Sequence, residues 1–169
     1  IAEKHHLVIF ADEIYDQMTY DGAEFVPMAT LAHHTLCCTM SGLSKVYRAC
    51  GYRVGWAVFS GDIENAREYL SALELLSSLR LCSNVAGQWA VQTALGGYQS
   101  VKELIRPGGR LYESRKAIVD AVARSKYLTL TVPRGALYAF VGVDTQRLPG
   151  FDDRRFAMDL LEHKHVLVA

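Results

Sequence analysis

The chain has 169 residues, half of them hydrophobic, and its 18 basic and 18 acidic residues give a formal net charge of zero. This length and composition suffice for one substantial core or for most of two small ones. A neutral chain argues against a nucleic-acid-binding protein, which needs basic side chains to neutralise phosphates. No apolar run in the sequence is long enough to span a bilayer.

The ends of the chain and its cysteines place it in a broad class. It starts at Ile1, without an initiator Met and without the pattern of a signal peptide. We expect it to begin at the end of a helix and to stop within a strand, as a fragment of a longer protein would. No CxxC or HExxH spacing is present, so we predict no metal site and free thiols in a cytoplasmic protein. The cysteines are Cys37, Cys38, Cys50 and Cys82.

Three apolar runs in the first part of the chain are predicted to be strands. Residues 7–11 form a short continuous run that suits a strand buried on both faces of a parallel sheet. Residues 35–40 and 52–59 form the second and third runs. Each run ends in polar residues or glycine, and ligands of α/β sheets bind at the carboxyl ends of strands. We therefore look for the site at these strand ends.

The next elements are predicted to be helices, followed by a hairpin. Apolar residues recur at steps of three and four over residues 62–80, and further helices are expected over 85–95 and 110–125. Alternating residues over 127–132 and 136–143 favour a β-hairpin around a Pro133-Arg-Gly135 turn. A last helix over 152–163 and a last strand over 166–168 follow. The simplest division is a mainly parallel α/β portion over residues 1–105 and a smaller α+β portion over 106–169.

Three local groups could carry chemistry, and each also has an ordinary structural explanation. Asp12 and Tyr15 follow the first strand, and Asp12 by itself suits a helix cap or a loop charge. Lys45 follows Ser41-Gly-Leu-Ser44 and by itself suits a solvated loop. Arg53 opens the third strand, where an arginine commonly forms a surface ion pair.

Taken together and in this order, these groups resemble the cofactor motifs of the class I and II aminotransferases of fold type I. In that family a run S-x-S-K or N-G-x-S-K is followed by an arginine eight residues after the lysine and then by G-[WY]. Lys45 and Arg53 have this separation, Gly55-Trp56 follows, and the D-E-x-Y element lies 33 residues before Lys45. Residues 84–88 and 133–138 also look like family landmarks, so the resemblance spans nearly the whole chain.

The resemblance implies a pyridoxal 5'-phosphate enzyme and gives each residue a role. Lys45 would hold the cofactor as a Schiff base and then act as the general base. Asp12 would pair with the pyridine nitrogen, and Tyr15 would hydrogen-bond the phenolic oxygen. Arg53 would bind the phosphate through its planar fork of donors. The implied fold is part of the large domain of fold type I, with a mainly parallel sheet and helices, plus part of the smaller C-terminal domain.

Some details of the resemblance stay open. Gly42 stands where the S-x-S-K form has its first serine, so either Ser41 or Ser44 could contact the phosphate. Arg48 is expected to be a solvated loop residue. In the family's homodimer the stretch around Arg80 and Asn84 approaches the neighbouring subunit's site, and a plain helix-terminus role suits these two residues equally well. A departure from the family pattern at Ala86-Gly87 suggests a looser turn.

The resemblance also narrows the reaction and shows what the chain lacks. The runs 41–48, 79–85 and 92–99 look like bacterial alanine aminotransferases, which transfer an amino group between alanine and 2-oxoglutarate. The remaining cofactor and substrate contacts of the family lie outside this chain, so we expect it to be inactive alone. Two alternatives remain. One is a β-lyase or decarboxylase on the same scaffold, and the other is a non-catalytic cofactor-binding module of a regulator.

Overall fold

The computed structural model describes residues 1–168, which divide into two compact units. The first unit comprises residues 1–112 and 134–137, and the second comprises residues 113–133 and those from 138 onward. The α/β class is as the sequence predicts. The assignment of residues 1–105 and 106–169 to two domains of the family stays a prediction.

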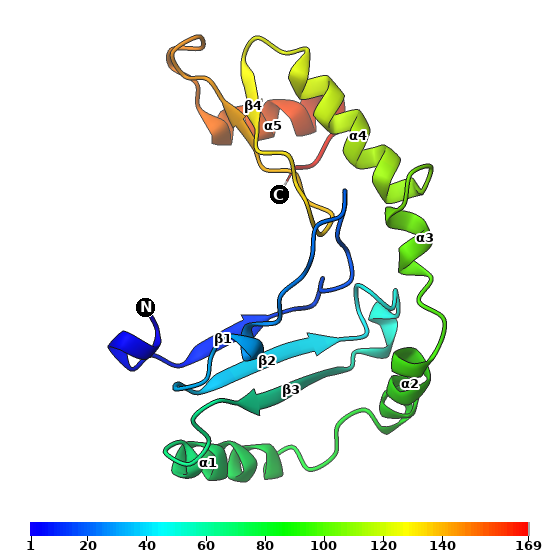
Figure 1. The fold of residues 1–169 in the computed structure, drawn as a ribbon. Helices are drawn as coiled ribbons and strands as arrows, with labels where there is room; N and C mark the ends of the chain where they lie inside the picture. Colours follow the sequence, from blue (N-terminus) through cyan, green and yellow to red (C-terminus); the bar gives the residue numbers. More distant parts are fainter. Residues whose placement is uncertain (169) are drawn as a thin grey trace. The chain divides into compact units, whose positions relative to one another are not determined.

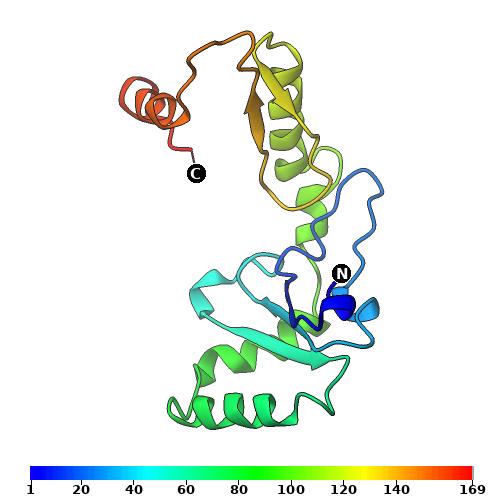
Figure 2. The same cartoon turned by 90° about the vertical axis from the view of Figure 1, so that its left-hand side faces the viewer.

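A three-stranded sheet runs through the first unit, with β2 (Cys37–Gly42) between β1 (Ile9–Asp12) and β3 (Gly55–Ser60) (Figure 1; Figure 2). β1 and β2 are parallel, whereas β3 runs antiparallel to β2. All three predicted strands are therefore present. The third begins later than expected, because residues 50–52 form the 3₁₀ turn η3 (Cys50–Tyr52). An antiparallel edge on a mixed sheet is common in folds of this kind.

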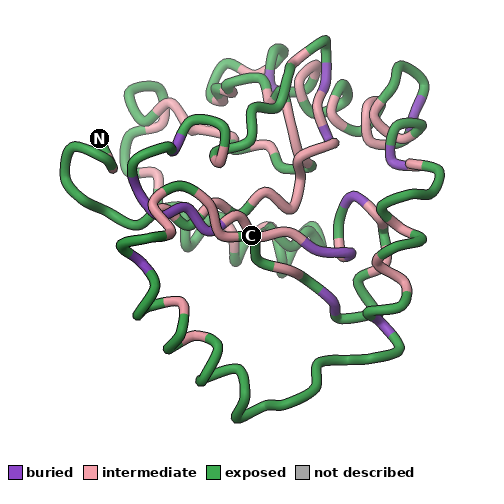
Figure 3. The backbone as a smooth tube through the Cα atoms, turned by 60° about the horizontal axis from the view of Figure 1, so that its bottom comes forward, coloured by how far each residue is buried: buried purple, intermediate pink, exposed green. Residues whose placement is uncertain are grey.

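Burial is concentrated on the central strand. Cys37 and Cys38 of β2 are almost fully buried, whereas Phe10 of β1 is 59% exposed. Figure 3 shows the buried residues as short stretches separated by exposed backbone. The expectation that the first strand is buried on both faces is therefore wrong, because the described residues leave Phe10 on an uncovered face.

The first unit also contains helices and further 3₁₀ turns. They are η1 (Glu3–His5), η2 (Met28–Thr30), α1 (Arg67–Ser78), α2 (Val85–Gly96) and α3 (Val101–Ile105). α1 starts five residues later than predicted, because Asp62 and Asn65 form a separate hydrogen-bonded turn before it. α2 matches its predicted bounds and is capped by the side chain of Asn84. The sequence did not predict α3, which is one short turn of helix.

A small core packs next to the sheet. Met18, Val46 and Val101 are each no more than 2% exposed and form one cluster. Half-buried side chains packed against it are Tyr15, Tyr47, Ile105 and Leu111. The core therefore joins the turn after β1, the loop after β2 and the start of α3.

The predicted hairpin is shorter than expected. β4 (Leu128–Leu130) and β5 (Val141–Val143) pair antiparallel, but residues 134–137 leave the hairpin and belong to the first unit. There Gly135 bridges to Thr19, and the Tyr20 hydroxyl donates to the carbonyl of Ala136 at 2.9 Å. Pairing with the segment after β1 thus replaces the strand pairs that were predicted next to the hairpin turn.

The second unit consists of that hairpin and two helices. The division between the units falls within α4 (Arg110–Ala123), and α5 (Asp153–Lys164) is capped by Asp152 at its start. His165 ends α5 in the left-handed region, with φ 56°. The predicted strand over residues 166–168 is wrong, because these exposed residues pair with no strand in the described part of the chain.

Candidate functional site

The predicted site residues lie at one edge of the sheet. Asp12 is the last residue of β1 and pairs with Met40, two residues before the end of β2. Since β1 and β2 are parallel, their carboxyl ends open on the same side. The loop carrying Lys45 leaves β2 at this edge, and the turn carrying Tyr15 leaves β1 there.

Lys45 and Tyr15 come together although 30 residues separate them in the sequence. The Lys45 ammonium nitrogen lies 5.8 Å from the centre of the Tyr15 ring. Tyr15 is half-buried against the Met18 cluster, whereas Lys45 is exposed. A cation near an aromatic face is weakly attracted to it. The lysine is thus held near a fixed aromatic group while its amine stays accessible.

Backbone hydrogen bonds close the loop that carries Lys45. The amide of Leu43 donates to the Val54 carbonyl at 3.0 Å, and the amide of Ala49 donates to the Leu43 carbonyl at 2.9 Å. Leu43 is fully buried and Val46 is 2% exposed. Lys45 therefore lies between two anchored residues, in a loop whose ends are fixed.

A steric limit explains why glycine stands at position 42. A Cβ added to Gly42 would lie 2.7 Å from the Val54 carbonyl oxygen and 3.1 Å from the Cα of Gly55. Gly42 and Gly55 are partners in the β2–β3 pairing, so the two backbones approach too closely for a side chain. A serine at position 42 would therefore push the strands apart.

The two serines next to this glycine remain candidates for the phosphate contact. Ser41 lies in β2 opposite Trp56, and Ser44 lies in the loop; both are half-buried. Within residues 1–168, neither hydroxyl has a hydrogen-bond partner, so both can bind a ligand. The choice between them stays open.

Arg53 is held in an unusual backbone conformation at the end of η3. Its φ of 52° and ψ of 46° lie in the left-handed region, which is uncommon for a residue with a side chain. Its guanidinium donates to the Cys50 carbonyl at 2.9 Å. In the described residues no hydrogen bond or ion pair joins Arg53 to Lys45 or to Asp12. The structure thus unites Lys45 with Tyr15 and places Arg53 separately, on the neighbouring turn.

Two titratable groups beside the Lys45 loop were missed by the sequence analysis. Asp16 follows Tyr15, and burial followed by the nearby charge of Glu13 raises the pKa of its carboxyl. Burial, and then the charge of Asp16, raises the pKa of the Tyr47 phenol, which packs against Trp56 with ring centres 6.3 Å apart. In both groups the protonated form is therefore more stable, relative to the ionised form, than it is in a fully solvated side chain. Both groups lie within two residues of a predicted site residue, but their pKa shifts depend on burial, which no local sequence pattern gives.

Two long-range hydrogen bonds were also missed. Arg48 is not a free loop residue, because its guanidinium donates to the Ser100 hydroxyl at 2.8 Å. The Asn84 side-chain amide donates to the Tyr52 carbonyl at 2.6 Å, in addition to capping α2. The partners are 52 and 32 residues apart, beyond the reach of motif analysis.

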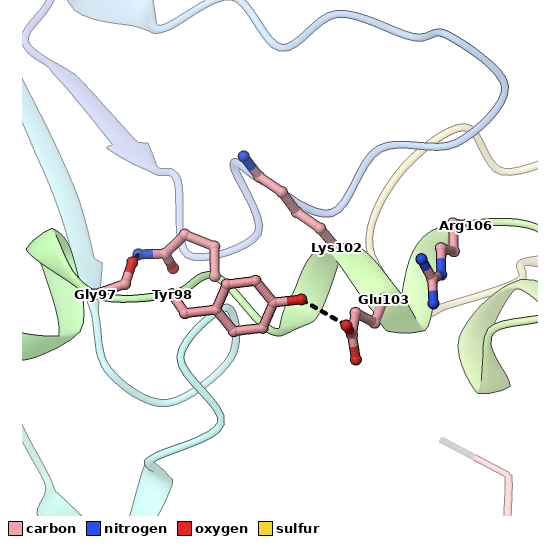
Figure 4. Close-up of a pocket in the computed structure, with 6 residues that line it drawn as sticks. Gly97, Tyr98, Lys102, Glu103 and Arg106 are labelled. Atoms are coloured by element: carbon pink, nitrogen blue, oxygen red, sulfur yellow. Dashed lines mark hydrogen bonds between the residues drawn. The ribbon is translucent and has the colours of Figure 1, made fainter.

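A hollow of about 400 Å³ lies elsewhere in the first unit, near α3. Figure 4 shows it with the Tyr98 hydroxyl donating to the Glu103 carboxylate at 2.5 Å. This hydrogen bond raises the pKa of the Tyr98 phenol. None of the predicted site residues lines the hollow, so it offers no alternative position for the Lys45 chemistry. Its lining residues are Gly97, Tyr98, Gln99, Lys102, Glu103 and Arg106.

No helix in the described residues combines the length and the apolar character that a membrane crossing requires. The family model described as "Aminotransferase class I and II" matches residues 1–169. Over 168 residues the chain is 48% identical to the glutamate-pyruvate aminotransferase AlaA of Escherichia coli K12, and it is 42% identical to an alanine aminotransferase of Mycobacterium bovis. Each match covers 99% of this chain but only 42% and 39% of these two relatives.

Solved structures show the same likeness. An aminotransferase from Escherichia coli superposes with a TM-score of 0.92 at 48% identity, covering 98% of this chain and 41% of that one. An alanine aminotransferase from Pyrococcus furiosus gives a TM-score of 0.87 at 33% identity, covering 98% of this chain and 41% of its own. The chain therefore spans about two fifths of the length of the relatives it matches.

Proposed function

Since this chain belongs to the class I and II aminotransferase family, we propose that it works as part of a full-length protein, a polypeptide of its relatives' length, that transfers amino groups with pyridoxal 5'-phosphate. The donor and acceptor are alanine and 2-oxoglutarate. The observation that carries the proposal is Lys45 on an anchored loop at the carboxyl edge of the sheet, with Tyr15 beside it. The chain alone is expected to have little or no activity.

The residues at this edge fit the cofactor in their chemistry. An accessible amine can hold an aldehyde, a carboxylate can pair with a ring nitrogen, and a guanidinium can bind a phosphate; Lys45, Asp12 and Arg53 supply these three groups. The cofactor would supply the aldehyde that carries the amino group and a ring that withdraws electrons.

Each residue has a distinct task in this reaction. Lys45 would hold the cofactor and, as a free amine, would serve as the general base for the proton on the substrate's α-carbon. Asp12 keeps the ring nitrogen protonated, because a facing carboxylate raises the basicity of that nitrogen. Tyr15 donates a hydrogen bond to the ring oxygen, and Arg53 binds the phosphate, helped by Ser41 or Ser44.

The substrates rest on the relatives. One relative, at 48% identity, is named for glutamate and pyruvate, which are the products of the proposed reaction, and another, at 42% identity, is named for alanine. The balanced reaction converts alanine and 2-oxoglutarate to pyruvate and glutamate. A β-lyase or a decarboxylase would use the same Lys45, so product analysis must separate these reactions.

A homodimer and a cytoplasmic location complete the proposal. The last turn of α1 and the residues after it expose Leu75, Leu76, Leu79 and Leu81 by 61–84%. A run of exposed leucines of this kind marks an apolar surface that another protein surface covers. The exposed thiols of Cys50 and Cys82 are free, which suits a reducing compartment.

The test is the visible absorbance of the full-length protein, combined with an assay of its products. Wild type should show the band of the bound cofactor and form glutamate and pyruvate in equal amounts. Lys45→Ala should lose the covalent band and lower turnover by about 10²–10⁴-fold or more, whereas Lys4→Ala, at an exposed lysine in η1, should change neither. With a cysteine conjugate as substrate, pyruvate formed without glutamate would indicate lyase chemistry, and a wild type that stays colourless with added cofactor would refute the proposal.

A further inference from the structure

The first turn of α2 is joined by hydrogen bonds to the turn that carries Arg53. Asn84 uses both ends of its side-chain amide: the oxygen accepts from the amide of Gly87 at 3.1 Å, and the nitrogen donates to the Tyr52 carbonyl at 2.6 Å. Tyr52 is the last residue of η3 and directly precedes Arg53. One side chain therefore starts the helix and holds the peptide group next to Arg53.

Packing reinforces this connection. Gly87 is buried, and a Cβ added there would collide with the Val54 side chain and lie 2.9 Å from the Tyr52 carbonyl oxygen. The helix thus approaches the residues on both sides of Arg53 as closely as a glycine permits. The Ala86-Gly87 departure, which suggested a looser turn from sequence, instead allows a tighter contact.

The same contact extends to the loop of Lys45. Val54, which Gly87 touches, is 8% exposed, and its carbonyl accepts the hydrogen bond from the Leu43 amide. The Arg53 turn therefore lies between α2 on one side and the anchored end of the Lys45 loop on the other. Arg53 itself occupies the left-handed region, which a residue with a side chain adopts only when its surroundings impose it.

We propose that Asn84 is a positioning residue for phosphate recognition: its hydrogen bond to the Tyr52 carbonyl fixes the peptide that orients Arg53. This inference rests on the proposed function, because it takes Arg53 as the residue that binds the cofactor's phosphate. Asn84 acts through the backbone and does not itself contact the cofactor. Its loss should therefore weaken binding only for ligands that carry the phosphate.

The experiment measures dissociation constants of pyridoxal 5'-phosphate and of pyridoxal for the full-length protein. The ratio of the pyridoxal constant to the pyridoxal 5'-phosphate constant isolates the contribution of the phosphate, and this ratio falls when phosphate recognition is lost. Asn84→Asp keeps an oxygen that can cap α2 but removes the donor to Tyr52. It should weaken binding of the phosphorylated form about tenfold, which corresponds to roughly 1.4 kcal/mol, and change pyridoxal binding less than about twofold.

Three further variants make the result decisive. Asn84→Ser keeps an uncharged capping oxygen without the donor, so it replaces Asn84→Asp if the added carboxylate prevents folding. Asn65→Ser, at an exposed asparagine before α1, should leave both constants unchanged. Arg53→Ala should reduce the ratio more than any Asn84 variant.

The outcomes separate the inference from the function on which it rests. Equal weakening of both ligands by Asn84→Asp and Asn84→Ser would show a merely structural role and overturn the inference. A reduced ratio in Arg53→Ala with an unchanged ratio in both Asn84 variants would overturn the inference and leave the proposed function in place. An unchanged ratio in Arg53→Ala, or no binding by wild type, would overturn the proposed function itself.

Discussion

Two regions of the first unit show opposite relations between regular structure and burial. The loop over residues 43–54 contains a single turn of 3₁₀ helix, yet Leu43, Val46 and Val54 are all at least 92% buried. α1 is a regular helix of 12 residues, and none of its residues is buried. The loop is therefore the anchored region and the helix the exposed one.

This difference shows where the chain stabilises its site. The Lys45 loop is fixed by its two backbone hydrogen bonds and by three buried apolar side chains, so its position depends on packing and not on secondary structure. α1 has the apolar pattern of a helix that faces a core, but Leu75 and Leu76 stay 72% and 61% exposed. A hydrophobic pattern predicts that a face will be covered; it does not say which surface covers it.

The sharpest test of this contrast is a matched pair of leucine truncations in the full-length protein. Leu43→Ala removes a fully buried side chain from the loop and should destabilise the fold by about 2–5 kcal/mol. Leu79→Ala, at a residue 81% exposed just after α1, should cost clearly less than Leu43→Ala, because the first unit does not enclose its side chain. Urea unfolding midpoints of the two variants measure the difference.

The covered-surface proposal gives this pair a second use. If a partner subunit covers the end of α1, Leu79→Ala should shift the equilibrium between dimer and monomer towards monomer in sedimentation. Leu43→Ala should not shift this equilibrium when the two variants are compared at the same folded fraction. A large loss of stability from Leu79→Ala without any change in assembly would contradict the contrast, since it would place Leu79 in a core.

A second comparison uses two glycines of the same loop region. Gly42→Ala places a Cβ 2.7 Å from the Val54 carbonyl, a backbone atom that cannot rotate away, and should destabilise the protein by about 1–3 kcal/mol. Gly51→Ala meets no atom within 4 Å and should be neutral or stabilising by up to about 1 kcal/mol. Thermal unfolding measures the melting temperature of both variants. Similar changes in melting temperature would show that the close approach of β2 and β3 does not exclude a side chain at position 42.

The strands and the family could be predicted from sequence because their signals are local, whereas the role of Lys45 stays a prediction. Apolar runs marked β1, β2 and β3, and the spacing of Lys45 and Arg53 indicated the family that the comparisons confirm. The contacts around the site could not be predicted, because they depend on chain segments far apart. The link from Arg48 to Ser100 crosses 52 residues, and no periodicity in either segment encodes it.

Two errors have the same physical origin. Residues 166–168 and the outer part of the hairpin have strand-like sequences, but a strand needs a partner to satisfy its backbone. Residues 134–137 find theirs at Thr19 and Tyr20, and residues 166–168 find none among the described residues. Strand propensity thus indicates which segments are extended, but it does not indicate which segment they pair with.

The smallest expected effect contrasts two carboxylates, one beside the Lys45 loop and one before α1. Burial raises the pKa of Asp16, so ionisation costs stability: the cost is absent below the unfolded pKa of about 3.9 and grows as pH rises through the folded pKa. Hydrogen bonds from Asn65 lower the pKa of Asp62, so its ionised form contributes stability that is lost as pH falls through the folded pKa.

Substitution by asparagine should therefore have opposite signs at the two positions. Asp16→Asn keeps an acceptor for the Gln17 amide and removes the costly charge, so it should slightly raise the melting temperature at pH 7, with the gain shrinking towards pH 4. Asp62→Asn should slightly lower it at pH 7, and this loss should persist down to about pH 4, because the folded pKa lies below its ordinary value of 3.8. Melting temperatures between pH 4 and pH 8 decide the matter. A change in melting temperature of the same sign for both variants would mean that the two carboxylates do not differ in how their surroundings stabilise the charge.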